Sequence, residues 1–135
     1  TDPTVADLDV LVEELRRADV EAVAICCLNS YVNGSNELKI AEHLRSALGI
    51  PVCISAEISP QIREYPRMVT TACNAATMPV IGPYLDELQK WLAAEGFGGS
   101  VLMMLSNGGV VSADEAARGP IRLIESGPAA GALAG

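Results

Sequence analysis

The sequence is poor in aromatic side chains, histidine and positive charge. Aromatic residues make up 4% of the 135 positions, His43 is the one histidine, and 9 lysines and arginines face 17 acidic residues, a net charge of −8. The scarcity of positive charge argues against a nucleic-acid-binding protein, because affinity for phosphate backbones comes largely from clustered lysine and arginine. No run of about 18 apolar residues occurs, so the sequence offers no candidate transmembrane helix and no membrane partner is predicted.

Signatures of metal binding are also missing. The four cysteines (Cys26, Cys27, Cys53 and Cys73) lack the paired spacing of a zinc ribbon. Three of them lie in apolar runs, where cysteine usually packs as a small buried hydrophobe. We therefore predict thiols that pack in the core and no metal ligands. Reduced thiols are typical of a cytoplasmic protein.

The composition that is present is that of a folded domain. Half of the residues are apolar and 19% are charged, and a chain of this length buries roughly 68% of its unfolded surface. It starts at Thr1 without methionine and stops at Gly135 inside a helix-like run of small residues. We expect one α/β fragment of a larger enzyme, with β–α units over 1–58, a helical segment over 59–98, and a strand–loop–strand segment over 99–135.

The first third alternates between helix and strand patterns. Residues 4–18 are amphipathic with a helical period, 35–48 form a second helix that Gly49 ends, and 51–55 read as a short strand. The continuous apolar run at 21–28 predicts a strand buried on both faces, as in parallel sheets. The apolar face of the second helix comprises Leu38, Ala41, Leu44 and Leu48.

The middle of the chain reads as helical. Ser59-Pro60 has the pattern of a helix start, and the helical period extends over 67–95 with a break at Pro79. Tyr84 and Trp91 belong to an apolar stripe and are predicted to lie in the core rather than to contact a ligand. The stripe comprises Val80, Ile81, Tyr84, Leu85, Leu88, Trp91 and Leu92.

Two strands are predicted in the last third, a buried one at 100–105 and a second at 121–124, and a glycine-bearing loop follows each. Between them, a capping box at 112–115 starts a short helix. The carboxyl ends of strands are where open α/β sheets bind ligands. The SGPAAG segment at 126–131 suits an anion at a helix start, or equally close helix packing, and it is not a Walker loop. The SNGG segment at 106–109 favours a tight turn, although its serine and asparagine could also face a ligand.

A polar segment at 55–71 lies between apolar ones. Its side chains could bind a polar substrate or assist proton transfer, but we favour a surface salt-bridge network. His43, next to Glu42 and off the apolar stripe, is predicted to be solvated, and no GxSxG elbow supports a serine hydrolase. The polar side chains of the segment are Glu57, Arg63, Glu64, Tyr65, Arg67, Thr70 and Thr71.

Three motifs in order carry a resemblance. They are SAEISPQIREYPRMVTTACNAATMPVIGPYLDEL at 55–88, LSNGGVVSADEA at 105–116 and GPIRLIESGPAAG at 119–131. In this combination the chain resembles the hydantoinase A/5-oxoprolinase family, and the similarity extends from 27–33 (CLNSYVN) to Gly131. The family includes ATP-dependent N-methylhydantoinases, 5-oxoprolinases, and subunits of acetone and acetophenone carboxylases.

The resemblance implies an actin/Hsp70/sugar-kinase-like (ribonuclease H-like) architecture, with ATP and Mg²⁺ in a cleft between two α/β lobes. It implies a hydrolase that activates the carbonyl of a cyclic amide for ring opening, as in the step of glutathione metabolism that opens 5-oxoproline, with a possible hydantoinase B-type subunit or domain as partner. The nucleotide would lie near Ser126, Gly127, Pro128, Ala129 and Gly131. The loop at the cleft edge would be Ser106, Asn107, Gly108 and Gly109, and the substrate-side candidates are Arg63, Glu64 and Tyr65.

One departure from the family pattern limits this expectation. The acidic, glycine-rich phosphate loops of the family (D-x-GGT-x-TD) are missing, and no aspartate follows Asp114. We therefore expect the main phosphate and Mg²⁺ ligands outside these residues, leave the catalytic residues unassigned, and expect no catalysis by the chain alone. The leading hypothesis is a fragment of an ATP-dependent hydantoinase or 5-oxoprolinase; the alternatives are a ketone carboxylase subunit and a structural domain inactive in isolation.

Overall fold

The computed structural model describes residues 2–134, and it forms two compact units that divide between Ala76 and Thr77. Helices make up most of the regular structure, alongside two small sheets. Within the described residues, no helix is both long enough and apolar enough to cross a bilayer. The segment bounds expected from the sequence (1–58, 59–98 and 99–135) stay a prediction.

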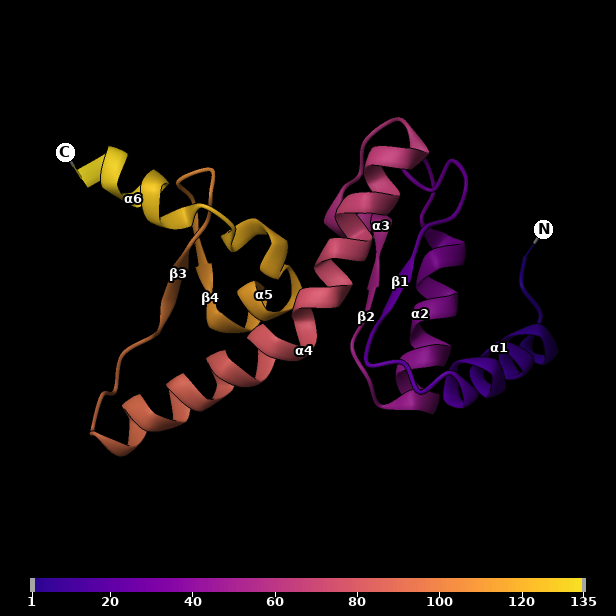
Figure 1. Ribbon diagram of the computed structural model, residues 1–135, viewed down its shortest axis with the longest axis horizontal. Helices are drawn as coiled ribbons and strands as arrows, with labels where there is room; N and C mark the ends of the chain where they lie inside the picture. The colour runs from indigo at the N-terminus through magenta and orange to yellow at the C-terminus, as the bar shows by residue number, and fades with distance from the viewer. Residues whose placement is uncertain (1, 135) are drawn as a thin grey trace. The chain divides into compact units, whose positions relative to one another are not determined.

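The first unit is built on a β–α–β arrangement (Figure 1). Helix α1 (Val5–Arg17) precedes strand β1 (Val23–Ile25), helix α2 (Ser35–Leu48) follows, and strand β2 (Val52–Ile54) leads directly into the short helix α3 (Ser55–Ile58). The two strands are parallel neighbours, with Val23 opposite Val52. The predicted parallel pairing across a helix is therefore confirmed.

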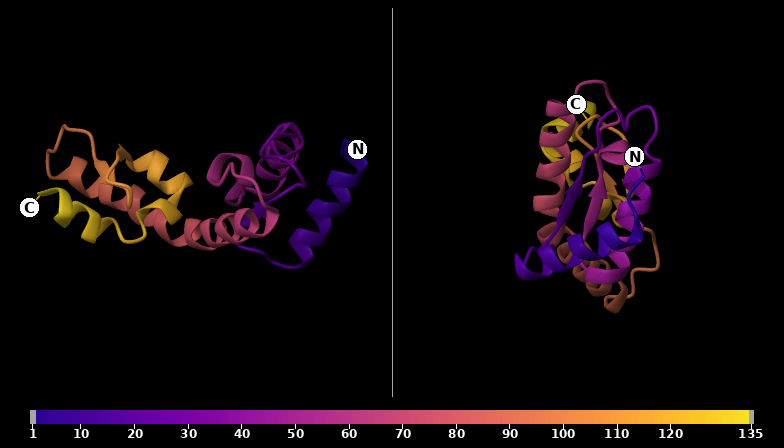
Figure 2. Two further views of the ribbon diagram at one scale, coloured as in Figure 1. Left: turned by 90° about the horizontal axis from the view of Figure 1, so that it is seen from above. Right: turned by 90° about the vertical axis from the view of Figure 1, so that its right-hand side faces the viewer.

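The core of this unit lies between α2 and the strands. Ala41 and Leu44 of α2 are fully buried against Ile25 and Ile54, and Val12 of α1 joins the same cluster. The right-hand view of Figure 2 shows the two strands between α2 and the beginning of helix α4 (Glu64–Ala94). The carboxyl ends of β1 and β2 consequently meet at one edge, where the candidate site lies.

Two burial predictions for this unit are wrong. Ala24 of β1 is exposed, so the strand is not buried on both faces. Leu38 of α2 is 42% exposed because it lies at the margin of the face that Ala41 and Leu44 present to the strands.

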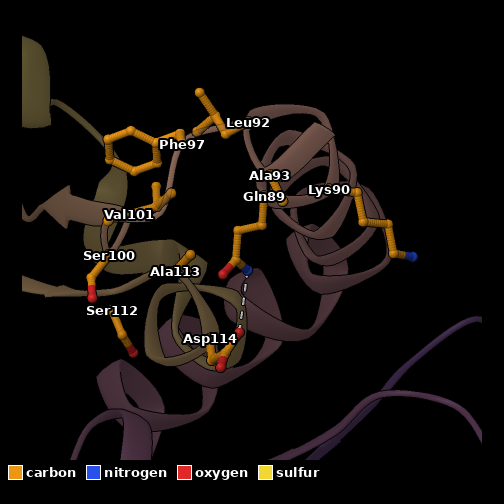
Figure 3. A pocket seen from close by; sticks show the side chains of 11 residues that line it. Gln89, Lys90, Leu92, Ala93, Phe97, Ser100, Val101, Ser112, Ala113 and Asp114 are labelled. Atoms are coloured by element: carbon orange, nitrogen blue, oxygen red, sulfur yellow. Dashed lines mark hydrogen bonds between the residues drawn. The ribbon is translucent and has the colours of Figure 1, made fainter. Parts of the chain in front are cut away.

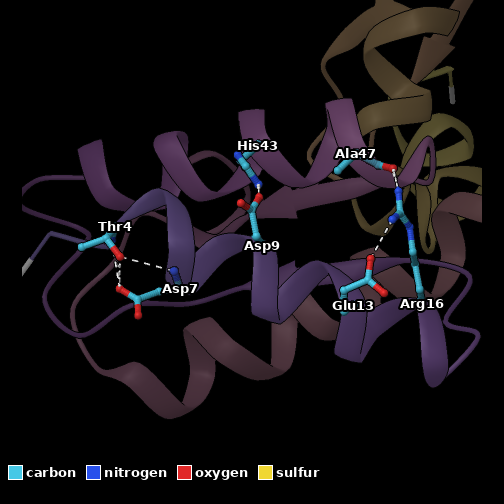
Figure 4. A network of polar contacts seen from close by, with 7 residues as sticks. All are labelled: Thr4, Asp7, Asp9, Glu13, Arg16, His43 and Ala47. Atoms are coloured by element: carbon cyan, nitrogen blue, oxygen red, sulfur yellow. Dashed lines mark hydrogen bonds and ion pairs between the residues drawn. The ribbon is translucent and has the colours of Figure 1, made fainter.

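Polar contacts hold α1 in place (Figure 4). Thr4 caps the helix in a reciprocal box with Asp7, whose carboxylate accepts from the Thr4 hydroxyl and backbone N–H; these hydrogen bonds lower the pKa of Asp7. His43 Nε2 of α2 lies 2.9 Å from Asp9 Oδ1 of α1. Arg16 Nη2 donates to the carbonyl of Ala47 at 2.8 Å. His43 thus ties two helices together and is partly covered rather than solvated as predicted.

The start of α4 differs from the prediction. Ser59 does not begin a helix; it ends α3, and its N–H donates to the Ser55 carbonyl at 2.9 Å. Arg63 has a φ of 82°, which no helix allows, so α4 begins only at Glu64. The helix then runs through Pro79 without the predicted break.

The second unit contains the later part of α4, a hairpin and three further helical segments. Strands β3 (Leu102–Met104) and β4 (Val110–Ser112) are antiparallel. Helix α5 (Ala113–Arg118), the 3-10 helix η1 (Pro120–Leu123) and helix α6 (Ser126–Ala134) follow. The predicted helix start at Ser112 is confirmed, since its hydroxyl accepts from the N–H of Glu115 and caps α5.

Strand predictions in this unit needed correction. Strand β3 is half exposed rather than buried, and β4 was not anticipated. The predicted strand at 121–124 is helix η1, because Pro120 lacks an N–H and fixes a helical φ at its first position.

The apolar stripe of α4 is only partly covered. Ile81, Leu85 and Leu88 pack against Ala113 and Ala116 of α5. The neighbouring stripe points elsewhere: the exposed fractions are 69% for Val80, 59% for Tyr84 and 58% for Trp91. The prediction that Tyr84 and Trp91 lie in the core is therefore wrong for this chain.

Shortening a core side chain of α2 should destabilise the fold. Leu44→Ala is expected to lower the free energy of unfolding by about 2–5 kcal/mol, because Leu44 is fully buried. Urea denaturation followed by circular dichroism measures this value. Leu38→Ala on the same helix is the matched control, and an equal loss in both variants would contradict the described packing.

Fluorescence of Trp91, the single tryptophan, should report an exposed indole. We expect acrylamide to quench the folded chain nearly as well as the urea-unfolded chain. Strong protection from quenching in the folded chain would restore the core interpretation. Trp91→Phe, which removes the signal, should change the unfolding free energy by no more than about 0.5 kcal/mol.

Candidate functional site

The carboxyl edge of β1 and β2 gathers the buried charges of the first unit. The loop at 26–34 leaves β1 there, α3 leaves β2 there, and the first turn of α4 lies beside both, since the N–H of Asn29 donates to Glu64 Oε1 at 3.4 Å. Such edges bring strand ends and helix starts together, which is where open α/β folds place ligands.

The carboxylate of Glu37 is fully buried at this edge. Its Oε1 accepts from the Cys27 N–H at 2.7 Å, the Ser30 hydroxyl at 2.6 Å and the Ser55 hydroxyl at 2.7 Å. Its Oε2 accepts from the Ala56 N–H at 2.9 Å. Donors from the loop after β1 and from α3 therefore converge on one side chain of α2.

These donors decide the ionisation of Glu37. Burial alone raises the pKa of a carboxyl group, but the hydrogen bonds from Ser30, Ser55, Cys27 and Ala56 favour the charged form and together outweigh it. The pKa of Glu37 is consequently lowered. Glu37 is ionised at neutral pH and acts as an acceptor, so it is a structural anchor rather than a proton donor.

Arg67, in the first turns of α4, is also fully buried. Its Nη2 donates to the Cys27 carbonyl and lies 3.5 Å from Cys26 Sγ. The ring of Tyr31 lies over the guanidinium, with the ring centre 5.6 Å from Cζ. Thr71 is also buried, and its hydroxyl donates to the Arg67 carbonyl at 2.7 Å. The prediction of a surface network is wrong for these two residues, because both point into the fold.

The three predicted substrate-side residues lie at the same edge. Arg63 and Tyr65 are exposed, Tyr65 by 73%, and Glu64 is partly buried. Arg63 occupies the left-handed region, an unfavourable conformation for a residue with a side chain. Their role in substrate binding stays a prediction, and the structure adds Arg67 as a buried cation beside them.

The loop Ser106–Gly109 is a turn pinned by its own hydrogen bonds. The N–H and hydroxyl of Ser106 both donate to the Arg122 carbonyl, at 2.8 and 3.0 Å. The Asn107 side chain accepts from the Gly109 N–H at 2.9 Å, and Gly108 has a φ of 84°. Both polar side chains therefore serve the hairpin in this structure, and a role at a cleft edge stays a prediction.

The SGPAAG segment forms the beginning of α6. Pro128 has no N–H and the Ala129 N–H faces the Glu125 carbonyl at 3.4 Å, which leaves the N–H groups of Ser126 and Gly127 available in the first turn. At Gly127 and Gly131, an added Cβ would meet no atom beyond the local helix backbone within 4 Å. Packing within the described chain therefore does not require these glycines.

A pocket of about 530 Å³ lies elsewhere in the second unit (Figure 3). Gln89 Nε2 donates to Asp114 Oδ1 at 3.3 Å across it, while Lys90 points away and pairs with Asp86 at 2.6 Å. Phe97 forms one wall. None of the predicted site residues lines this pocket.

The cysteines carry no described metal site. Cys53 is buried, as predicted, and Cys27 is partly buried; burial raises the pKa of both thiols, and the negative charge of Glu37 raises that of Cys27 further. Cys73 is exposed. It lies outside the apolar runs on which the prediction of core packing was based. Residues 2–134 contain no group of three or more His, Cys, Asp or Glu able to hold a metal ion.

Sequence reasoning missed Glu37, Ser30 and Ser55. A glutamate on an amphipathic helix is normally solvent-exposed, so the pattern gave no reason to bury it. The available signal was the position of Ser30 and Ser55 close behind two apolar runs, Ser30 two residues after Leu28 and Ser55 directly after Ile54.

Replacing the buried carboxylate tests its structural role. Glu37→Gln should lower the unfolding free energy by about 3 kcal/mol at neutral pH, because the amide accepts fewer of the four hydrogen bonds. Glu42→Gln, on the exposed side of α2, is the control and should change little. Both are measured by urea denaturation.

The pH dependence follows from the lowered pKa of Glu37. The unfolded carboxyl binds a proton more readily than the folded one, so its stabilisation is complete above the ordinary carboxyl pKa and is lost as the pH falls through the lower folded value. Wild type should lose stability in this acidic range more steeply than Glu37→Gln. Parallel curves for the two proteins would contradict the assignment.

Comparison with known proteins matches this chain over most of its length. The family model described as Hydantoinase/oxoprolinase matches residues 67–135, and that of the Hydantoinase/oxoprolinase N-terminal region matches residues 2–48. An uncharacterized protein of Methanocaldococcus jannaschii is 37% identical over 95% of the chain, and the caprolactamase alpha subunit of Pseudomonas jessenii is 34% identical over 96%. The chain covers 19% of each, about a fifth of their length.

One further sequence relative and two solved structures are also similar to the chain. The 5-oxoprolinase of Saccharomyces cerevisiae is 29% identical over 97% of the chain, which covers 10% of that protein. Nucleotide-free acetone carboxylase has a TM-score of 0.75 at 28% identity, covering 95% of this chain and 18% of that one. The ATP-dependent caprolactamase of P. jessenii has a TM-score of 0.73 at 34% identity, covering 80% and 16%. By these matches the chain belongs to the hydantoinase/oxoprolinase family.

Proposed function

We propose that this chain is part of an ATP-dependent enzyme that opens the ring of a cyclic amide. The observation that carries the proposal is the similarity, along nearly the whole chain, to proteins named caprolactamase and 5-oxoprolinase. Caprolactam and 5-oxoproline are both lactams, so the shared chemistry is attack on a cyclic amide carbonyl. The proposal takes the parent protein to be a hydrolase, with the actin/Hsp70-like, two-lobed architecture that the family resemblance implies and a location in the cytoplasm.

ATP would approach the beginning of α6. The N–H groups of Ser126 and Gly127 could hold phosphate oxygens, and the open space at Gly127 and Gly131 would let a large group come close to the backbone. When bound, ATP supplies the phosphoryl group that activates the amide carbonyl. The role of this chain would be to bind and orient.

The described residues supply no metal site that is complete in itself. Residues 2–134 contain no group of three or more His, Cys, Asp or Glu able to hold a metal ion, and Mg²⁺ usually takes one or two carboxylates together with substrate phosphates and waters. The ligands for this ion would come from other parts of the parent protein, so no step is assigned to it here. A hydantoinase B-type subunit or domain is the proposed partner.

A second candidate is a ketone carboxylase subunit. The TM-score of 0.75 with acetone carboxylase favours it. In that case activation by ATP would serve carboxylation of a ketone, with bicarbonate as co-substrate. A third possibility, a structural segment with no activity in isolation, predicts that the 135-residue chain binds no nucleotide.

Release of ADP by the full-length parent, with its B-type partner if separate, distinguishes these candidates. We expect stimulation by 5-oxoproline, caprolactam or N-methylhydantoin, with one ring opened per ADP. Stimulation only by acetone with bicarbonate would replace this function with ketone carboxylation. If none of the four substrates stimulates ADP release, both ring opening and ketone carboxylation lose their support.

A pair of glycine variants tests the nucleotide position. Gly127→Ala in the parent should raise the KM for ATP by about tenfold, because the added methyl group would occupy the open space through which the phosphate approaches the backbone N–H groups. Gly82→Ala, at another helix position with no atom within 4 Å of the added Cβ, is the control and should leave KM unchanged. Equal KM values in the two variants would move the nucleotide away from α6.

A further inference from the structure

In the second unit, one apolar face of helix α4 is left uncovered by the described residues. The hairpin and α5 lie along another side of the helix, where Leu85 packs against Ala113 (Figure 1). Val80, Tyr84 and Trp91 lie on the open face, and each side chain is more than half exposed. Their spacing places them along one side of a helix, over a length of about 16 Å. An apolar stripe of this kind on a protein surface is typical of an interaction site.

Two carboxylates lie on the same face. Glu87 precedes Trp91 by one turn and Glu95 follows it by one turn, since each is four residues away. Both are exposed, and within the described part of the chain neither forms an ion pair. Lys90, the one cation in the later part of α4, is already paired with Asp86 at 2.6 Å. The face therefore combines an aromatic ring with negative charge on both sides of it.

We propose that this face docks a helix from the part of the parent protein outside these 135 residues, with an arginine of that helix over Trp91 and between Glu87 and Glu95. A guanidinium stacks on an indole ring and donates to carboxylates at the same time. Apolar side chains further along the docked helix would cover Tyr84 and Val80, because two packed helices match their side-chain ridges and grooves over several turns.

The length of the relatives indicates where this helix comes from. The chain covers 19% of the caprolactamase alpha subunit, so about four fifths of that protein has no counterpart in it. A second copy of the chain suits the face less well, because it would bring Glu87 and Glu95 against like charges. The docking rests on the proposed function only in taking the chain as part of a longer protein. Protection of Trp91 and release of ADP are separate measurements, so either proposal can fail alone.

Hydroxyl-radical labelling read by mass spectrometry tests this face at single residues. The oxidation rates of Tyr84 and Trp91 are compared between the 135-residue chain and the full-length parent, without nucleotide or substrate. We expect both rates to be about tenfold lower in the parent, because the core of an interface excludes water. Equal rates would overturn the proposal, and protection that disappears when the parent is diluted would overturn it in favour of a second copy.

A charge-reversal pair tests the chemistry of the docked helix. In the parent, Glu87→Lys combined with Glu95→Lys should raise the rate of Trp91 oxidation about threefold or more, because like charges facing each other across an interface are strongly unfavourable. The matched control, Glu14→Lys combined with Glu42→Lys, makes the same charge change at exposed positions of the first unit. It should leave Trp91 protected. Full protection in the Glu87 and Glu95 variant would contradict the proposal.

Thermal unfolding gives a readout that does not depend on the charge variants. Tyr84→Ala combined with Trp91→Ala should lower the melting temperature of the parent by about 2 °C or more. The same change should shift the melting temperature of the 135-residue chain by less than half as much, since these side chains are exposed there. An equal shift in both proteins would show that the parent does not cover this face, and the proposal would then be abandoned.

Discussion

The buried carboxylate of Glu37 is the contact on which the first unit depends. It takes hydrogen bonds from the loop after β1, through Cys27 and Ser30, and from the start of α3, through Ser55 and Ala56. Apolar packing of α2 on the strands would leave the positions of these loops open, because it fixes only the helix. A charge that must be fully hydrogen-bonded allows far fewer arrangements. The carboxyl edge is therefore specified by electrostatics rather than by packing.

The same constraint brings two opposite charges to the backbone of one residue. The Cys27 N–H donates to Glu37, and the Cys27 carbonyl accepts from Arg67. The pair is satisfied unequally, however: Glu37 receives four donors, whereas Arg67 keeps Nε and Nη1 without acceptors in the described structure. The two buried charges of the edge therefore differ in how completely their hydrogen bonds are satisfied.

The sequence predicted those elements whose signals are local. The apolar period and Gly49, with a φ of 67°, defined α2, and the short apolar run defined β2. The prediction from the sequence was wrong where burial depends on which elements pack against a helix. Trp91 has the spacing of a core residue, but the hairpin and α5 cover a different stripe of α4. The buried charges were beyond pattern reasoning, because Glu37 and Arg67 are of the types normally placed at the surface.

The distribution of charge also bears on what the chain contributes to the proposed reaction. Phosphoryl transfer depends on neutralising phosphate charge, usually with Mg²⁺ and carboxylates around it. Around α6 the chain offers small residues and backbone N–H groups, with no described carboxylate cluster. In the first unit, by contrast, a buried arginine and a buried glutamate both bind the backbone of one loop. This arrangement suits the orientation of a polar ligand, while the charge neutralisation needed for phosphoryl transfer would depend on groups elsewhere in the parent protein.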